Sequence, residues 1–262
     1  MTETAVAAAL SAARTEGVRC DDPVVLRAAW HTLVHLRPSP VVARVSSSIP
    51  YPQGPNPDDI ARELAVAAHC ARAGCAVVPP LGGPYHEAGH VVTFWEYVPP
   101  HDAPDEREAM RALREIHDAL ETYDGPLPAF GHPADVDAML DALPPGDDVE
   151  LLRAIAARRP QVDGQPLHGD AHLFNVLGSP GGPLWHDFET ACQGPREYDL
   201  AAFSEDAALE AYGPYDRELV EAMWPFYSAW VTASMLTALP RRPDLAATVE
   251  RRLRQLRERR DA

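Results

Sequence analysis

Lysine is absent from this chain of 262 residues, and all 23 basic residues are arginine. Any permanently cationic side chain in a site therefore has to be an arginine. The chain also lacks a run of about eighteen uncharged apolar residues, so we expect neither a membrane span nor a membrane partner. The four cysteines form no CxxC pair, which argues against a cysteine metal site or a disulfide framework.

A basic start followed by an apolar run is missing from the first segment, MTETAVAAALSAARTEG. The segment favours an alanine-rich helix over a secretory signal, so we expect a cytoplasmic protein. The length allows one large domain or two lobes with a sizeable core.

Positive charge is scarce overall, and the net charge of −16 at pH 7 makes nucleic acid a poor partner. The acidity is concentrated in residues 101–150, where 14 Asp and Glu stand against 3 Arg. Such a stretch is commonly a solvated face, but in a cleft it would attract a cationic ligand. Both interpretations stay open at this point.

The pattern of predicted elements changes near Val98. Before it we expect the first helix, strands over 21–30, 31–38, 39–46, 77–81 and 90–98, and a helix over 56–74 capped by Asn56 or Asp58. After it we expect helices over about 103–122, 133–143, 147–158, 198–211, 216–238 and 243–260. The order predicts an α+β fold with a small β-rich lobe over 1–98 and a larger, mostly helical lobe over 99–262.

Polar groups interrupt the apolar stretch LHGDAHLFNVLG, which is followed by the turn signal SPGGP and then by LWHDFE. In an antiparallel hairpin, residues equally far from the turn centre face each other. Asn175 and Asp187 each lie six positions from Gly181, so we expect them together at the open end of a hairpin. Two oxygen ligands suit Mg²⁺, and the nearby Asp170 would be left to accept a proton.

The segments HGDAHLFN, HDFE and GPREYDLA together resemble the aminoglycoside phosphotransferase and choline kinase-like family. The resemblance is close over about 168–202, and elsewhere it rests on the order of elements. It implies a protein-kinase-like fold and transfer of phosphate from ATP or GTP to a hydroxyl of a small molecule. It further implies that Asp170 is the catalytic base, that Asn175 and Asp187 bind Mg²⁺, and that Asp199 braces the catalytic loop.

Folds of this kind hold the nucleotide phosphates with a cation on the third strand, which a helix carboxylate holds in turn. Arg44 in PVVARVS occupies that strand, and Glu63 lies inside the apolar stripe of the following helix, where a carboxylate needs a partner. We therefore expect an Arg44–Glu63 pair; the alternative is a surface pair worth at most about 1 kcal/mol. The segment WEYVPP resembles the hinge, where the backbone of Glu96 and Val98 would bind adenine.

Glycine is missing between Val18 and Gln53, so the sequence has no Gly-rich phosphate turn. The first turn instead falls near residues 28–32, AAWHT. How the phosphates are covered, and the choice between ATP and GTP, stay open.

Three more polar residues belong to the predicted site. We expect His168 and His172 to support the loop around Asp170. Glu189 returns to the face of Asp187, where it could touch substrate or metal. The acceptor is expected to be a small molecule bearing an amine, such as an aminoglycoside-type antibiotic or an amino alcohol, and the protein a monomer or homodimer.

Two other classes remain. The HGD histidine and aspartate with a distant histidine also fit a 2-His-1-carboxylate iron site, but that needs a β-barrel host and leaves Asn175, Asp187 and Glu63 unexplained. The missing glycine turn favours a pseudokinase-like nucleotide-binding module, whereas the intact Asp170, Asn175 and Asp187 disfavour it.

Overall fold

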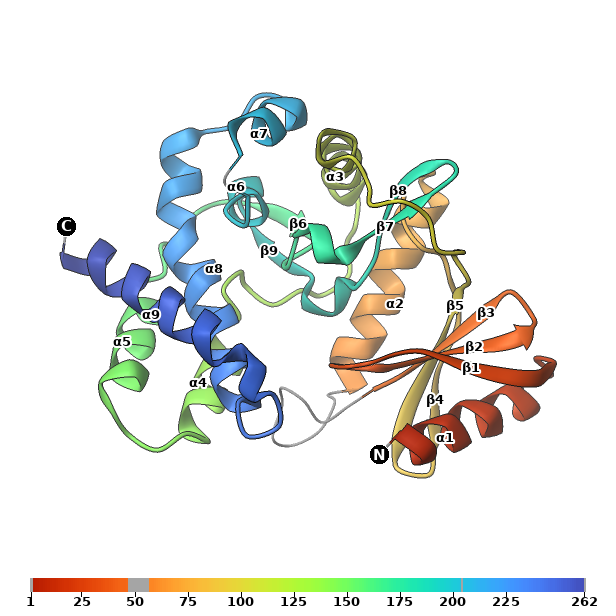
Figure 1. Ribbon diagram of the computed structural model, residues 1–262. Coiled ribbons are helices and arrows are strands. Elements are labelled where there is room, and N and C mark those ends of the chain that lie inside the picture. The colour runs from red at the N-terminus through yellow and green to blue at the C-terminus, as the bar shows by residue number, and fades with distance from the viewer. Residues whose placement is uncertain (1, 47–56, 204, 262) are drawn as a thin grey trace.

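A computed structural model describes residues 2–46, 57–203 and 205–261. Figure 1 shows a small β-rich lobe at the N-terminal end and a larger helical lobe that contains the C-terminus. The α+β fold predicted from the sequence, with a strand-rich lobe preceding a helical one, is confirmed.

The small lobe is built on one antiparallel sheet in the strand order β1-β2-β3-β5-β4. Its strands and its covering helix are α1 (Thr2–Thr15), β1 (Cys20–Ala28), β2 (Thr32–Pro38), β3 (Val41–Val45), β4 (Pro80–Glu87) and β5 (His90–Glu96). The buried alanines of α1, including Ala9 and Ala12, pack against Val34, Leu36 and Phe94 of the sheet. Small side chains on the buried face of α1 let the helix approach the strands closely, as the alanine-rich segment predicted.

Helix α2 (Pro57–Arg72) lies between the sheet and the helical lobe (Figure 1). Its buried residues Val66, Ala67 and Cys70 join Leu113 and Trp185 in the core of the helical lobe. Of the two predicted caps, Asn56 lies outside the described residues. The alternative cap, Asp58, is wrong, because α2 begins one residue earlier, at Pro57.

The strand predicted over 77–81 is wrong in its bounds, since β4 begins at Pro80. Val77 and Val78 are buried instead in the core of the helical lobe, and the Val78 N–H donates to the Trp185 carbonyl at 2.9 Å. These two residues are therefore apolar because they pack in the core of the helical lobe, and not because they belong to the sheet.

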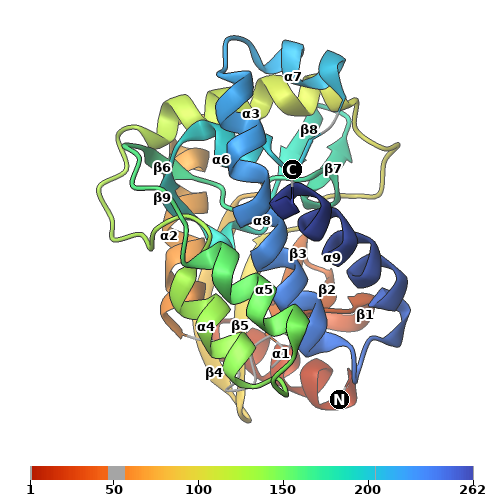
Figure 2. The same ribbon diagram turned by 90° about the vertical axis from the view of Figure 1, so that its left-hand side faces the viewer.

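The helical lobe holds two short hairpin-like sheets among its helices. Its elements are α3 (Glu106–Leu120), α4 (Pro133–Asp141), α5 (Asp147–Ala156), β6 (Gln165–Leu167), η1 (Leu173–Asn175), β7 (Val176–Ser179), β8 (Gly182–Trp185), η2 (Phe188–Thr190), β9 (Cys192–Gly194), α6 (Arg196–Leu200), α7 (Asp206–Tyr212), α8 (Arg217–Ala238), η3 (Pro243–Leu245) and α9 (Ala246–Asp261). Helices α4, α5, α8 and α9 pack together on one side, as Figure 2 shows.

One helix predicted in this lobe is divided. The segment predicted as a single helix over 198–211 forms α6 and α7, with α6 ending at Leu200. Phe203 and Leu209 are both buried in the same core, so tertiary packing of the side chains overrides a continuous helix here. Among the described residues, none of the helices has the length and apolarity needed to cross a membrane.

Candidate active site

The loop around the HGD segment is held by a buried carboxylate. Asp199 Oδ2 accepts a hydrogen bond from the His168 N–H at 2.9 Å, and its Oδ1 accepts one from the Gly169 N–H at 2.8 Å. The His117 Nε2 lies 2.9 Å from Asp199 Oδ2 and completes the set. A carboxylate that accepts hydrogen bonds from two adjacent backbone N–H groups holds the loop in place. Asp199 therefore lies where a residue that braces the loop is expected.

Gly169 has no room for a side chain. Its φ is +88°, and an added Cβ would lie 1.7 Å from the Thr190 carbonyl oxygen. The loop therefore passes directly over the backbone of η2, and this close approach brings Asp170 next to the segment that carries Asp187.

We expect Gly169→Ala to lower the free energy of unfolding by about 3 kcal/mol or more, because backbone must move to admit the methyl group. Gly181→Ala is the matched control, since an added Cβ there would meet nothing closer than Ser179 Oγ at 3.7 Å. Urea unfolding of both variants measures the effect, and equal stability of the two would contradict the close packing at Gly169.

The Asp170 carboxylate is oriented on both of its oxygens. Tyr227 donates its hydroxyl to Oδ1 at 3.2 Å, and the His172 Nε2 lies 3.3 Å from Oδ2. The Asn175 amide nitrogen donates to the Asp170 carbonyl at 2.9 Å. The side chain stays 20% exposed, so the carboxylate is both fixed and accessible to a small molecule.

The two loop histidines differ in their surroundings. His168 is fully buried, its Nε2 donates to the His186 carbonyl at 3.0 Å, and its Nδ1 faces the Asp170 N–H at 3.4 Å. Burial lowers the pKa of His168, so the ring is neutral. Burial also opposes protonation of His172, but the adjacent Asp170 outweighs it and raises the His172 pKa. Both ring nitrogens of His168 face backbone groups. His168 therefore has no nitrogen left to bind iron, as the iron-site alternative would require.

The hairpin register differs by one residue from the prediction. Val176 pairs with Trp185 and Ser179 with Gly182, so Asn175 faces His186, whose N–H donates to the Asn175 carbonyl at 3.0 Å. The expected direct pairing of Asn175 with Asp187 is therefore wrong. The reason is the turn, in which two residues, Pro180 and Gly181, connect the strands in place of a turn centred on Gly181.

Asp187 lies just beyond the end of β8 in the left-handed region, with φ of +70° and ψ of 56°. Aspartate is one of the few residues that tolerate this conformation, and such backbones concentrate at functional sites. The turn directs the Asp187 side chain toward the small lobe, where its Oδ1 accepts from the Arg44 guanidinium at 3.0 Å.

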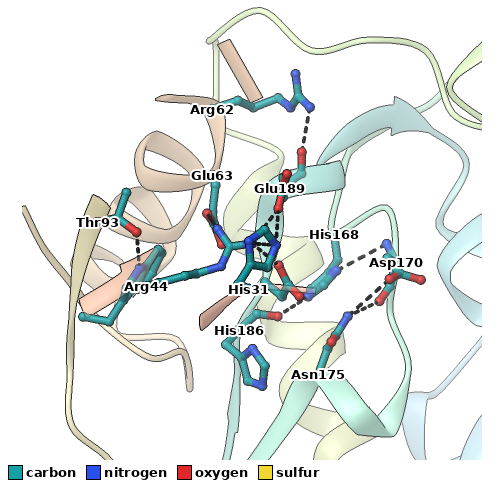
Figure 3. Close-up of polar contacts among 12 residues, drawn as sticks. His31, Arg44, Arg62, Glu63, Thr93, His168, Asp170, Asn175, His186 and Glu189 are labelled. Carbon is teal, nitrogen blue, oxygen red and sulfur yellow. Dashed lines mark hydrogen bonds and ion pairs between the residues drawn. The ribbon is translucent and has the colours of Figure 1, made fainter. Parts of the chain in front are cut away.

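Arg44 of β3 connects the two lobes, as Figure 3 shows. Its Nη1 pairs with Glu63 of α2, the partner expected from the sequence, and both side chains are buried. Its Nη2 reaches Asp187 and, at 2.5 Å, Glu189 Oε2. The interpretation of Arg44–Glu63 as a surface pair is therefore wrong, because both members are buried.

One guanidinium serves three carboxylates in this cluster. Burial disfavours the ionised form of Glu189, but Arg44 and His31 outweigh it and hold the Glu189 pKa well below its usual value. Burial raises the pKa of Glu63. Because the buried cluster holds three carboxyl groups and one guanidinium, it carries excess negative charge, which another cation would neutralise.

The donor atoms in the cluster fit a hard divalent cation. Asp187 and Glu189 offer carboxylate oxygens, and with His31 their ligand atoms lie within 4.8 Å of one another. Asn175 uses its amide nitrogen on Asp170, so its amide oxygen is the atom that could ligate a metal. Oxygen donors of this kind suit Mg²⁺.

The predicted hinge follows β5. The Glu96 N–H donates to the Pro79 carbonyl at 3.0 Å, so its carbonyl is the group that could meet a base. Val98 lies two residues farther on and is half-buried. The role of both residues in binding a base stays a prediction.

Two residues with site contacts were not predicted from the sequence. His31, in the β1–β2 turn, contacts Arg44 and Glu189. Tyr227 of α8 contacts Asp170 through its hydroxyl, and the residue as a whole is buried, with 4% exposed. The AAWHT segment at the place of a phosphate turn was the one signal that could have identified His31.

Comparison with solved structures shows the fold. Choline kinase LicA from Streptococcus pneumoniae shares 14% sequence identity over 95% of this chain and 96% of that chain, with a TM-score of 0.71. Amicoumacin kinase hAmiN, solved with AMP-PNP, Ca²⁺ and Ami, shares 12% identity over 95% and 93% of the two chains, with a TM-score of 0.67. A choline/ethanolamine kinase family protein from Mesorhizobium loti shares 16% identity over 98% and 94%, with a TM-score of 0.66.

Direct comparison of the sequence with curated proteins gave no match. The model of the phosphotransferase enzyme family, in contrast, matches residues 32–236. That span contains Arg44, Glu63, the HGD loop and the HDFE segment, and it begins one residue after His31. The resemblance seen in the motifs is thereby confirmed, and the chain belongs to the phosphotransferase enzyme family.

Proposed function

We propose that this protein transfers the γ-phosphate of ATP or GTP to a hydroxyl group of a small, amine-bearing acceptor. The observation that carries the proposal is the pairing of an oriented, accessible Asp170 with the buried Arg44–Glu63–Asp187–Glu189 cluster. Membership of a phosphotransferase family supports the reaction class. The nucleotide would lie between the lobes of residues 1–98 and 99–262.

In this proposal the residues have distinct roles in one displacement. Asp170 accepts the proton of the acceptor hydroxyl as its oxygen forms a bond to the γ-phosphorus and the bond to the β-phosphate oxygen breaks. Tyr227 and His172 hold the carboxylate in place through one contact on each oxygen. Fixed geometry of this kind is where most of the catalytic gain in phosphoryl transfer originates.

Charge compensation falls to the cluster at Arg44. Arg44 binds nucleotide phosphate oxygens and is itself held by Glu63. Asp187, Asn175 and Glu189 would hold Mg²⁺, which, when bound, supplies positive charge to the transferring phosphate. The Glu96 carbonyl and the Val98 N–H would hold the base.

Two separate observations support the proposal that the acceptor carries an amine. Similar folds include choline kinase and aminoglycoside phosphotransferases, whose named substrates carry cationic nitrogen. The acidic stretch over 101–150 lies in the helical lobe, although arginines outside it neutralise part of its charge. These pairs are Arg196 with Asp118 and Glu121, Arg153 with Asp137 and Asp141, and Arg257 with Asp148.

The proposal is tested by screening acceptors for stimulated release of nucleoside diphosphate, with ATP and GTP as donors. When matched amino and hydroxy compounds are compared, the protein should prefer the amino compound. For that acceptor, kcat/KM should fall as salt rises, since screening acts over about 8 Å at physiological ionic strength. The saturating rate should change much less, because proton transfer at Asp170 is local.

Free Mg²⁺ is held constant through the salt series. If a neutral alcohol is the preferred acceptor and its kcat/KM does not change with salt, the proposed amine on the acceptor is contradicted. The phosphotransferase reaction itself would still stand. Release of diphosphate with none of the acceptors would contradict the reaction itself.

A further inference from the structure

The turn between β1 and β2 lies where a kinase-like fold covers the phosphates, yet this turn has no glycine. The residues connecting the strands are Ala29, Trp30 and His31, and the Ala29 N–H donates to the His31 carbonyl at 3.1 Å. That bond uses one of the three backbone N–H groups of the turn, so fewer backbone donors remain to meet a phosphate.

The His31 side chain points from this turn into the cluster at Arg44 (Figure 3). Its Nε2 lies 2.7 Å from Arg44 Nη2 and 3.1 Å from Glu189 Oε2, and the side chain is 13% exposed. Its Nδ1 is buried and has no hydrogen-bond partner in the part of the chain that is described. A buried ring nitrogen without a partner indicates a position that a ligand would complete.

The turn is also held from its outer side. The Arg242 guanidinium, from the segment after α8, lies 5.8 Å from the centre of the Trp30 ring. This cation–π contact joins the small lobe to the helical lobe next to His31. The turn is thereby kept over the site with the imidazole inside.

We propose that His31 is a ligand of the nucleotide phosphates and replaces, with its side chain, the backbone donors of a Gly-rich turn. The inference rests on the proposed function. A phosphate oxygen that replaces a carboxylate on Arg44 Nη2 would lie beside the imidazole, because the His31 Nε2 is 2.7 Å from that nitrogen. An imidazole N–H then donates to that phosphate.

The same atoms offer a second occupant, a metal ion held by His31, Asp187 and Glu189. The chemistry of His31 favours the phosphate. Mg²⁺ prefers oxygen ligands, which Asp187, Glu189 and Asn175 offer, whereas an imidazole N–H beside the Arg44 guanidinium suits an anion. The metal is therefore an outcome to be tested.

The test compares His31→Leu with His31→Gln, two side chains of similar bulk of which only Gln keeps an N–H donor. Titration calorimetry measures binding of ATP, ADP and adenosine at fixed free Mg²⁺. We expect His31→Leu to bind ATP roughly 10- to 100-fold more weakly, the loss for a hydrogen bond to a charged group, and adenosine unchanged. His31→Gln should recover part of the affinity, and the exposed His86→Leu on β4 is the control.

The outcomes distinguish the phosphate role of His31 from the proposed phosphotransferase function. Unchanged ATP affinity in His31→Leu, with a wild type that binds ATP, would overturn the role of His31 alone. A wild type that binds no nucleotide would instead contradict the proposed function. Mn²⁺ binding without nucleotide, followed by electron paramagnetic resonance, should be equal in wild type and His31→Leu; its loss in the variant would make His31 a metal ligand and overturn the phosphate role.

Discussion

Asp170→Asn is expected to lower kcat by roughly 10²–10⁴-fold, the usual contribution of a general base. The amide keeps the shape of the carboxylate and an oxygen for the Tyr227 hydroxyl, but it cannot accept the proton of the acceptor. Nucleotide affinity should stay close to the wild-type value, because Asp170 makes no contact with Arg44 among the described residues. Steady-state kinetics and calorimetry of the same preparation measure both quantities.

The matched control for this change is Asp163→Asn, at an exposed aspartate that precedes β6. It removes the same charge from the same lobe and should leave kcat unaltered. Thermal unfolding of both variants checks that the fold is kept. Near-normal turnover in Asp170→Asn would remove Asp170 from the role of base.

Asp187→Asn is expected to weaken strongly the Mg²⁺ dependence of nucleotide binding, because it removes the negative charge of a ligand. Loss of an outer-shell partner alone costs roughly 10–100-fold in metal affinity, so this change should cost at least that much. Asparagine is the informative replacement because it tolerates the left-handed backbone at this position, where φ is +70°. Asp187→Ala would remove the ligand as well but would add backbone strain.

Calorimetry with and without Mg²⁺ measures the effect of Asp187→Asn. Glu189→Gln is the comparison, since it alters the neighbouring carboxylate of the same cluster and keeps Asp187. If Asp187→Asn retains the metal dependence of the wild type, the ligand lies elsewhere in the cluster.

Local sequence patterns were sufficient for much of the fold and for part of the site. The alanine-rich start predicted α1, and the change at Pro99-Pro100 marked the passage from sheet to helices. Glu63 could be paired with Arg44 because a carboxylate inside an apolar helix stripe requires a partner, and the structure contains that pair.

The rest depends on details that periodicity does not encode. The hairpin register follows from a two-residue turn at Pro180 and Gly181, so Asn175 faces His186, the residue before Asp187. The contact of Arg44 with Asp187 joins residues 143 positions apart and arises only when the lobes pack. Tyr227 and Asp170 are 57 positions apart in the sequence, and their contact likewise arises only in the folded structure.

The absence of glycine from the first turn was visible in the sequence, whereas the contacts of His31 with Arg44 and Glu189 became apparent only in the structure. The direction of a side chain in a short turn depends on tertiary contacts, and Trp30 of the same turn lies against Arg242 of the helical lobe.

The proposed transfer of a phosphoryl group from a nucleoside triphosphate to an acceptor hydroxyl can be followed by mass spectrometry. An amine-bearing acceptor is incubated with the protein, Mg²⁺ and ATP or GTP. We expect the acceptor to gain the mass of one phosphoryl group, in amounts equal to the nucleoside diphosphate formed, with the wild type but not with Asp170→Asn. Diphosphate formation accompanied by inorganic phosphate and an unmodified acceptor, equal in both proteins, would contradict it.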